Sequence, residues 1–118
     1  METTRREKRI ANLIKEALSR LLIEEVPGTS SALITITRVE MSHDLLTAHV
    51  YLSLFGWEDK DAVLALLERR KGYFRKSIAS TVNLKYNPQL IFALDPLLNY
   101  EEKIDQLIER AKKNANES

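Results

Sequence analysis

The sequence contains no cysteine, and this absence excludes several kinds of site. A chain without cysteine has no disulfide framework, no thiolate nucleophile and no cysteine-ligated zinc. Long apolar runs are missing too. No stretch approaches the roughly 20 apolar residues of a membrane span, and the first residues lack the apolar run of a secretory signal. We therefore expect a cytoplasmic protein without membrane contact.

Glycine and histidine are scarce, which limits the cofactors that the chain can hold. The glycines Gly28, Gly56 and Gly72 form neither a G-x-G-x-x-G nor a G-x-x-x-x-G-K-[ST] loop, so no nucleotide cofactor is expected. His43 and His49 are the only histidines, and a metal site would need carboxylates that the fold brings to them. We expect no cofactor, no metal and no small-molecule substrate.

One short segment offers a catalytic interpretation. Ser42, His43 and Asp44 are the residue types of a hydrolytic triad, but a working triad needs side chains that converge from separate elements, whereas neighbours on a turn point apart. The acidic run at 58–61 precedes a predicted helix, where carboxylates interact favourably with the helix dipole. A small hydrolase that uses Asp44 and a histidine is the weakest of three hypotheses.

The residues that are present suit a single folded domain. With 118 residues, of which 44% are hydrophobic and 30% are charged, the chain has room for one globular core. We assign residues 1–118 to this domain and expect frayed termini at 1–4 and 113–118.

Hydrophobic spacing predicts a helix followed by a hairpin. Apolar residues at i, i+3, i+4, i+7 and i+8 predict an amphipathic helix over 5–25, which ends before Pro27-Gly28. β-Branched and aromatic residues predict strands over 33–39 and 47–55. The turn residues between them predict an antiparallel pair.

The second half of the chain predicts helices around one further strand. An apolar helix over 62–68 is interrupted at Gly72, where we expect a kink that uses the freedom of glycine in φ. Helical spacing resumes over 74–82, a strand follows over 89–94, and a C-terminal helix is expected over 99–112. A third strand that arrives after helices implies a crossover, and so an α+β fold with a mixed three-stranded sheet and helices on one face.

The formal net charge of +1 hides an uneven distribution. Residues 5–20 carry six cations and two acids, and residues 69–94 carry six cations and no acid. These windows carry +4 and +6, so the rest of the chain carries −9. We expect basic and acidic faces on the folded molecule.

The segment RRKGYFRK at 69–76 concentrates this positive charge around Gly72. An ordinary explanation is a solvated helix face, but such faces usually interleave acids with bases. The cations also stand near a predicted helix start, where the helix dipole would reinforce attraction for phosphate. Tyr73, Lys85 and Tyr86 offer hydrogen-bonding or stacking groups nearby. We therefore predict a surface that binds a polyanion.

The order of elements, with a glycine break between two helices, is that of a type II KH domain without its G-x-x-G loop. Three segments, RIANLIKEALSRLL, ITITRVEMSHDLLTAHVYLSLFG and ERRKGYFRKSIASTVNLKYNPQLIFALD, together resemble the ribosome-binding factor A family over about residues 5–112. That family has a KH-like fold in which an Ala-x-Gly kink replaces the loop. Here the corresponding residues are Arg70-Lys71-Gly72, so the glycine is kept and the alanine is not.

The resemblance implies a non-catalytic, monomeric factor. It would bind the RNA of the small ribosomal subunit during late maturation and ribosomal RNA processing, and would matter for growth in the cold. Combined with the charge distribution, it assigns RNA binding to Arg5, Arg6, Lys8, Arg9, Arg70, Lys71, Gly72, Arg75, Lys76 and Lys85. The alternative function, of a different class, is that of a protein–protein adaptor with polarised charge.

Overall fold

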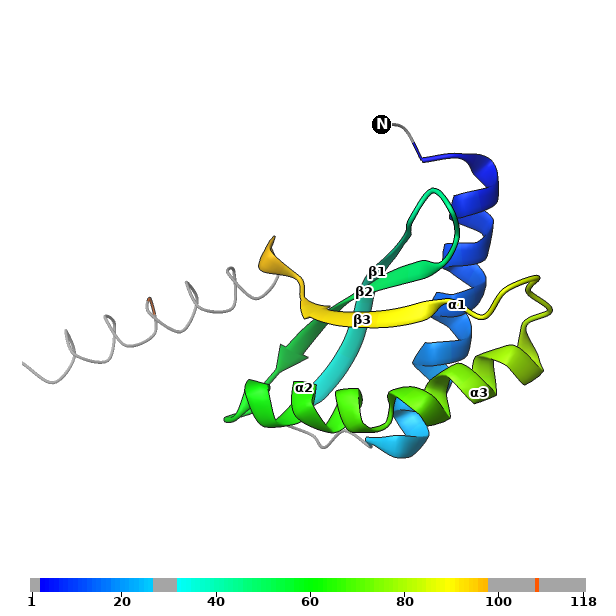
Figure 1. Ribbon diagram of the computed structural model, residues 1–118. Helices are drawn as coiled ribbons and strands as arrows, with labels where there is room; N and C mark the ends of the chain where they lie inside the picture. The colour runs from blue at the N-terminus through cyan, green and yellow to red at the C-terminus, as the bar shows by residue number, and fades with distance from the viewer. Residues whose placement is uncertain (1–2, 27–31, 98–107, 109–118) are drawn as a thin grey trace, which may run out of the picture.

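The computed structural model describes residues 3–26, 32–97 and 108, and its elements follow the predicted order (Figure 1). Their bounds are α1 Arg5–Glu25, β1 Leu33–Met41, β2 Thr47–Phe55, α2 Lys60–Arg69, α3 Lys71–Thr81 and β3 Gln89–Leu94. The helix predicted over 99–112 lies outside the described residues, except for residue 108.

Helix α1 begins at a capping box and buries one apolar face. The Thr4 hydroxyl accepts a hydrogen bond from the Glu7 amide (3.1 Å), and the Glu7 carboxylate accepts one from the Thr4 amide (3.3 Å). Ile14, Leu18 and Leu22 are buried on the core side. The helix has the bounds that its apolar spacing predicts. No helix among the described residues, α1 included, is long and apolar enough to cross a membrane.

The strands form a mixed sheet in the order β1-β2-β3. β1 and β2 pair antiparallel, and β2 and β3 pair parallel, so β2 lies in the centre. The parallel pair requires a crossover connection, which α2 and α3 supply. The predicted mixed sheet of three strands is therefore confirmed, although β1 continues to Met41, beyond the predicted end at residue 39.

One face of the sheet carries the core. Along β2, Ala48, Val50, Leu52 and Leu54 are fully buried and alternate with half-buried residues on the opposite face. Buried side chains from all three helices, among them Phe74 of α3, join these residues in one hydrophobic cluster. The helices therefore cover this face, as predicted for an α+β layer.

A β-bulge at Thr37 changes the direction of the side chains halfway along β1. The register with β2 shifts between Ile36 and Arg38, so Ile36 is buried before the bulge and Met41 after it. The Thr37 hydroxyl donates a hydrogen bond to the buried carboxylate of Asp95 (2.6 Å). The bulge thus ties β1 to the residue that follows β3.

The break between the two crossover helices falls at Arg70, with φ −91° and ψ 2°, and not at Gly72. Gly72 lies inside α3 and does not adopt a positive φ, unlike Gly56. The prediction of two helical pieces is confirmed, whereas the prediction that glycine provides the kink is wrong. An ordinary residue can adopt the conformation found at Arg70, so the break needs no glycine.

Candidate nucleic-acid interface

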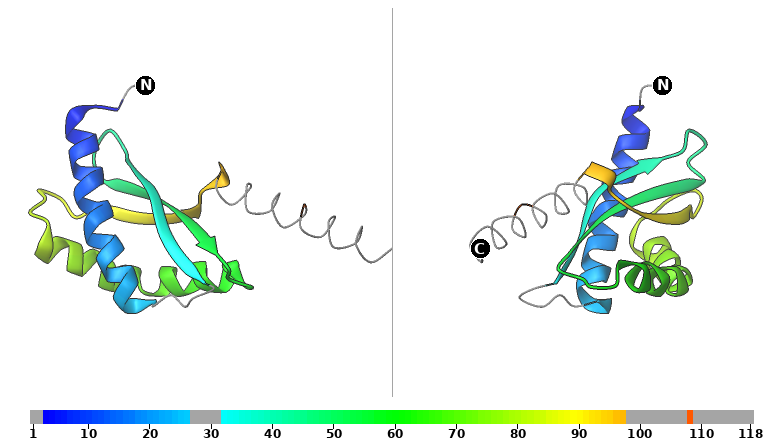
Figure 2. Two further views of the ribbon diagram at one scale, coloured as in Figure 1. Left: turned by 180° about the vertical axis from the view of Figure 1, so that it is seen from behind. Right: turned by 90° about the vertical axis from the view of Figure 1, so that its left-hand side faces the viewer.

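A groove lies between the N-terminal half of α1 and the loop that joins α3 to β3. Figures 1 and 2 show the backbone of these two segments. Its volume is about 550 Å³, and a hollow of about 30 Å³ adjoins it beside the β1–β2 turn. We call the two together the α1 groove. It is lined by Arg5, Arg6, Arg9, Ile10, Leu13, Leu45, Asn83, Leu84, Lys85 and Tyr86.

The lining of the α1 groove contains four cations and no acid. The cations Arg5, Arg6, Arg9 and Lys85 are all exposed, and none has an ion-pair partner among the described residues. Lys85 instead lies over the ring of Tyr86, with Nζ 5.4 Å from the ring centroid. A groove lined in this way attracts a polyanion.

The cations of α1 oppose the stability of their own helix. Arg5, Arg6 and Lys8 lie in the first turn, where the positive end of the helix dipole disfavours a cation by about 0.3–1 kcal/mol. Arg5 and Arg9 are also four residues apart, a spacing at which like charges repel. A phosphate bound beside them would offset both penalties.

The one acid in the first two turns of α1 does not line the groove. Glu7 is buried, and its carboxylate lies 2.9 Å from Nδ1 of His43 in the β1–β2 turn. The hydrogen bond with His43 lowers the pKa of Glu7 and outweighs the opposing effect of burial, while hydrogen bonds with Thr4 lower it further. The Glu7 carboxylate is therefore directed to the hairpin, and it forms no ion pair with the arginines among the described residues.

Arg75 holds the loop that carries Lys85. Its guanidinium donates hydrogen bonds to the backbone oxygens of Pro88 (3.0 Å) and Asn87 (3.1 Å), and the Asn87 side chain donates back to the Arg75 carbonyl (3.1 Å). The sequence predicts Arg75 as a phosphate contact. In the folded chain the Arg75 side chain anchors one wall of the α1 groove to α3, a role that the sequence does not indicate.

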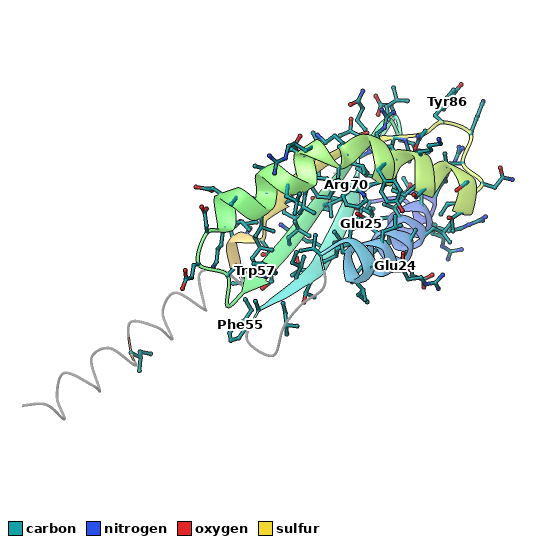
Figure 3. The ribbon with its side chains drawn as sticks, turned by 90° about the horizontal axis from the view of Figure 1, so that it is seen from below. Glu24, Glu25, Phe55, Trp57, Arg70 and Tyr86 are labelled. Carbon is teal, nitrogen blue, oxygen red and sulfur yellow. The ribbon has the colours of Figure 1, made fainter. Side chains whose placement is uncertain are left out.

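The helix break carries a second group of cations, two of which have acidic partners. Arg70 forms an ion pair with Glu25 at the end of α1 (Figure 3). Lys71 Nζ lies 2.8 Å from a carboxylate oxygen of Glu68. The prediction that the cations around the break lack counterions is wrong for these two residues. Folding brings Glu25 of α1 to Arg70, and Glu68, one residue outside the acid-free window, pairs with Lys71. Lys76 is exposed and has no acidic partner among the described residues.

The two groups of cations lie toward opposite ends of α1. The helix has 21 residues, which corresponds to a length of about 30 Å. The α1 groove is at the Arg5 end, and Arg70 is at the Glu25 end. Figure 3 shows Tyr86 well away from Arg70. The structure therefore brings together Arg5, Arg6, Arg9 and Lys85 but separates them from Arg70, Lys71 and Gly72.

Ser42, His43 and Asp44 stabilise the hairpin turn. The Ser42 hydroxyl donates a hydrogen bond to Asp44 (2.6 Å) and accepts one from the Thr47 amide (3.0 Å). His43 is directed to Glu7. Within this segment the hydroxyl and the imidazole do not meet, so the side chains lack the geometry of a nucleophile and its base.

Sequence reasoning missed the apolar part of the groove. Ile10 and Leu13 belong to the apolar spacing that predicts α1, and that spacing alone indicates no binding role for them, yet Leu13 is 37% exposed and both line the groove. The width of the apolar stripe is the sequence signal that could have identified Ile10 and Leu13 as groove residues. No sequence signal places Leu84 in one groove lining with residues of α1, because that arrangement depends on the packing of α3.

Comparison with known proteins identifies the relatives of this chain. The sequence profile described as ribosome-binding factor A matches residues 6–108. Ribosome-binding factor A of Carboxydothermus hydrogenoformans is 34% identical over 112 residues, which cover 94% of this chain and 90% of that protein.

Two structures of the Thermus thermophilus protein have a similar fold. The crystal structure of ribosome-binding factor A from this organism aligns with a TM-score of 0.63 and 22% identity, covering 75% of this chain and 94% of that chain. A homology model of the Thermus factor, fitted into a cryo-electron microscopy map of its 30S complex, aligns with a TM-score of 0.59 and 22% identity, covering 80% and 97%.

Proposed function

Because the chain belongs to the ribosome-binding factor A family, we propose that it binds the RNA of the small ribosomal subunit and promotes late maturation of that subunit. In this proposal it acts without catalysis, as a cytoplasmic monomer. The proposal extends to ribosomal RNA processing and to growth in the cold.

The α1 groove is the observation that carries this proposal. Four exposed cations line it, and no acid of the described residues pairs with them. The fitted Thermus coordinates supply independent support, because that factor is described in complex with the 30S subunit. Ribosomal RNA would provide phosphates for these cations.

The mechanism is electrostatic docking followed by selection on shape. Each cation that neutralises a phosphate releases a condensed counterion, so affinity falls as salt rises. Backbone and shape contacts dominate the recognition of structured RNA, and the immature subunit would be distinguished by the path of its RNA. Two further lysines are candidates for phosphate contacts. Lys8 lies beside the groove, and Lys76 is exposed on α3.

Cosedimentation with purified small subunits tests the proposal. We expect the wild-type protein to comigrate with the subunits on a sucrose gradient and the double variant Arg6→Gln/Arg9→Gln to stay largely at the top. The matched control Arg20→Gln/Arg69→Gln removes two cations that do not line the groove. It should comigrate like the wild type.

The adaptor hypothesis predicts a different outcome of the same experiment. An adaptor that binds protein would still comigrate with the ribosomal particles after ribonuclease treatment. Its comigration would not depend on Arg6 and Arg9. That result would contradict RNA binding through the α1 groove.

A further inference from the structure

The α1 groove contains apolar surface that a plain phosphate-binding patch does not need. Leu13 is 37% exposed and Tyr86 is 57% exposed, although both lie beside unpaired cations. Half-buried Ile10 and Leu84 continue the apolar wall between them. Cations that contacted only phosphates would leave this wall in water.

The segments around the groove are fixed by hydrogen bonds within the protein. The capping box of Thr4 and Glu7 sets the start of α1, and Arg75 anchors the α3–β3 loop. Ser42 and Asp44 close the β1–β2 turn beside the hollow. A groove of about 550 Å³ held in this way is preformed, and its volume lies in the range of small-ligand sites.

The two forms of RNA match this lining differently. A duplex presents phosphates and sugars outward and keeps its bases stacked inside, so an apolar wall gains little from it. An unpaired nucleotide offers a charged backbone and a free aromatic base, which stacks on a tyrosine or packs on aliphatic side chains. Only the unpaired form uses both the cations and the apolar wall.

We propose that the α1 groove binds an unpaired RNA nucleotide. Arg5, Arg6, Arg9 and Lys85 contact its backbone phosphates, and its base lies against the apolar wall that runs from Leu13 to Tyr86. This inference rests on the proposed function and narrows it from ribosomal RNA in general to a single-stranded segment.

Fluorescence anisotropy with two labelled RNA probes tests this inference. One probe is a single strand of mixed sequence, and the other is a hairpin duplex with the same number of phosphates, both at one low salt concentration. We expect the wild type to bind the single strand at least about five-fold more tightly. Leu13→Ser and Tyr86→Ser should each lower single-strand affinity about five-fold or more and leave duplex affinity and the salt slope unchanged.

Matched controls separate the groove from general surface effects. Ile23→Ser, at a 72% exposed position of α1, and Tyr73→Ser, at a 42% exposed position of α3, remove the same kinds of side chain outside the groove. Both should bind like the wild type. Thermal unfolding of every variant checks that it is folded.

The outcomes distinguish this inference from the proposed function. Equal affinity for the two probes, binding of neither probe, or groove variants that behave like their controls would overturn the inference. The proposed function would stand if the same protein still comigrated with purified small subunits. A wild-type protein that bound neither the probes nor the subunits would overturn both.

Discussion

Arg5 occupies the first position of α1, where its charge meets the positive end of the helix dipole and the like charge of Arg9. We expect Arg5→Gln to raise the free energy of unfolding by about 0.5 kcal/mol and to weaken RNA binding. Stability rises while binding weakens because the positive charge of Arg5 destabilises the helix but attracts phosphate. Chemical denaturation and an RNA-binding titration on one preparation measure both quantities.

Arg20 provides the control for this prediction, because it lies on the same helix but outside the first turn and the groove. Arg20→Gln should change neither quantity appreciably. A loss of stability in Arg5→Gln would show that the arginine supports the helix, and would remove the argument that binding explains its position.

Gly72 gives a second prediction at the scale of single residues. It is exposed, lies in α3 without a positive φ, and a Cβ built on it meets no atom within 4 Å. Gly72→Ala should therefore stabilise the protein by about 0.5–1 kcal/mol, through the lower backbone entropy of the unfolded chain. A melting temperature below that of the wild type would mean that the glycine is needed for the geometry of the break.

At the scale of elements, the contact between Glu7 and His43 joins the start of α1 to the β1–β2 hairpin. Because folding lowers the pKa of Glu7 below its ordinary value of 4.5, the carboxylate adds stability that is fully present above that value and is lost as the pH falls through the lower, folded pKa. We expect Glu7→Gln, which can still complete the capping box, to lose less stability than the wild type as the pH falls below 4.5.

Denaturation at several pH values measures this difference, with Glu24→Gln, an exposed carboxylate of the same helix, as the control. The Asp44 pKa is also lowered, chiefly by the Ser42 hydroxyl, so part of the acid-sensitive stability remains in the Glu7 variant. An acid profile of Glu7→Gln identical to that of the wild type would exclude a contribution from the α1–hairpin contact.

The elements themselves could be predicted from the sequence because their signals are local. The period of the apolar residues set the bounds of α1, and alternation along Thr47–Phe55 identified the central strand. The bulge at Thr37 could not be predicted, because its hydrogen-bond partner Asp95 lies 58 residues away in the sequence. The sequence predicts the break at Gly72, two residues after its position at Arg70, because glycine is a common cause of a break in a helix.

At the scale of the whole molecule, counting charges along the chain located the basic segments but did not show which cations are free. The count identified Arg5 and Lys85 in separate windows, and folding brings them into one groove. It also identified Arg70, which folding pairs with Glu25. Ion pairs between elements depend on tertiary structure, so a count within a window cannot detect them.

The salt dependence of binding tests the central claim most directly. We would measure the affinity for purified small subunits against salt concentration for the wild type, Lys85→Ala and Lys71→Ala, two lysine substitutions that differ in whether the lysine has an acidic partner. The account predicts that Lys85→Ala lowers the log–log slope by roughly 1 and that Lys71→Ala leaves it unchanged. A slope lowered by Lys71→Ala but not by Lys85→Ala would contradict it and place the RNA at the helix break.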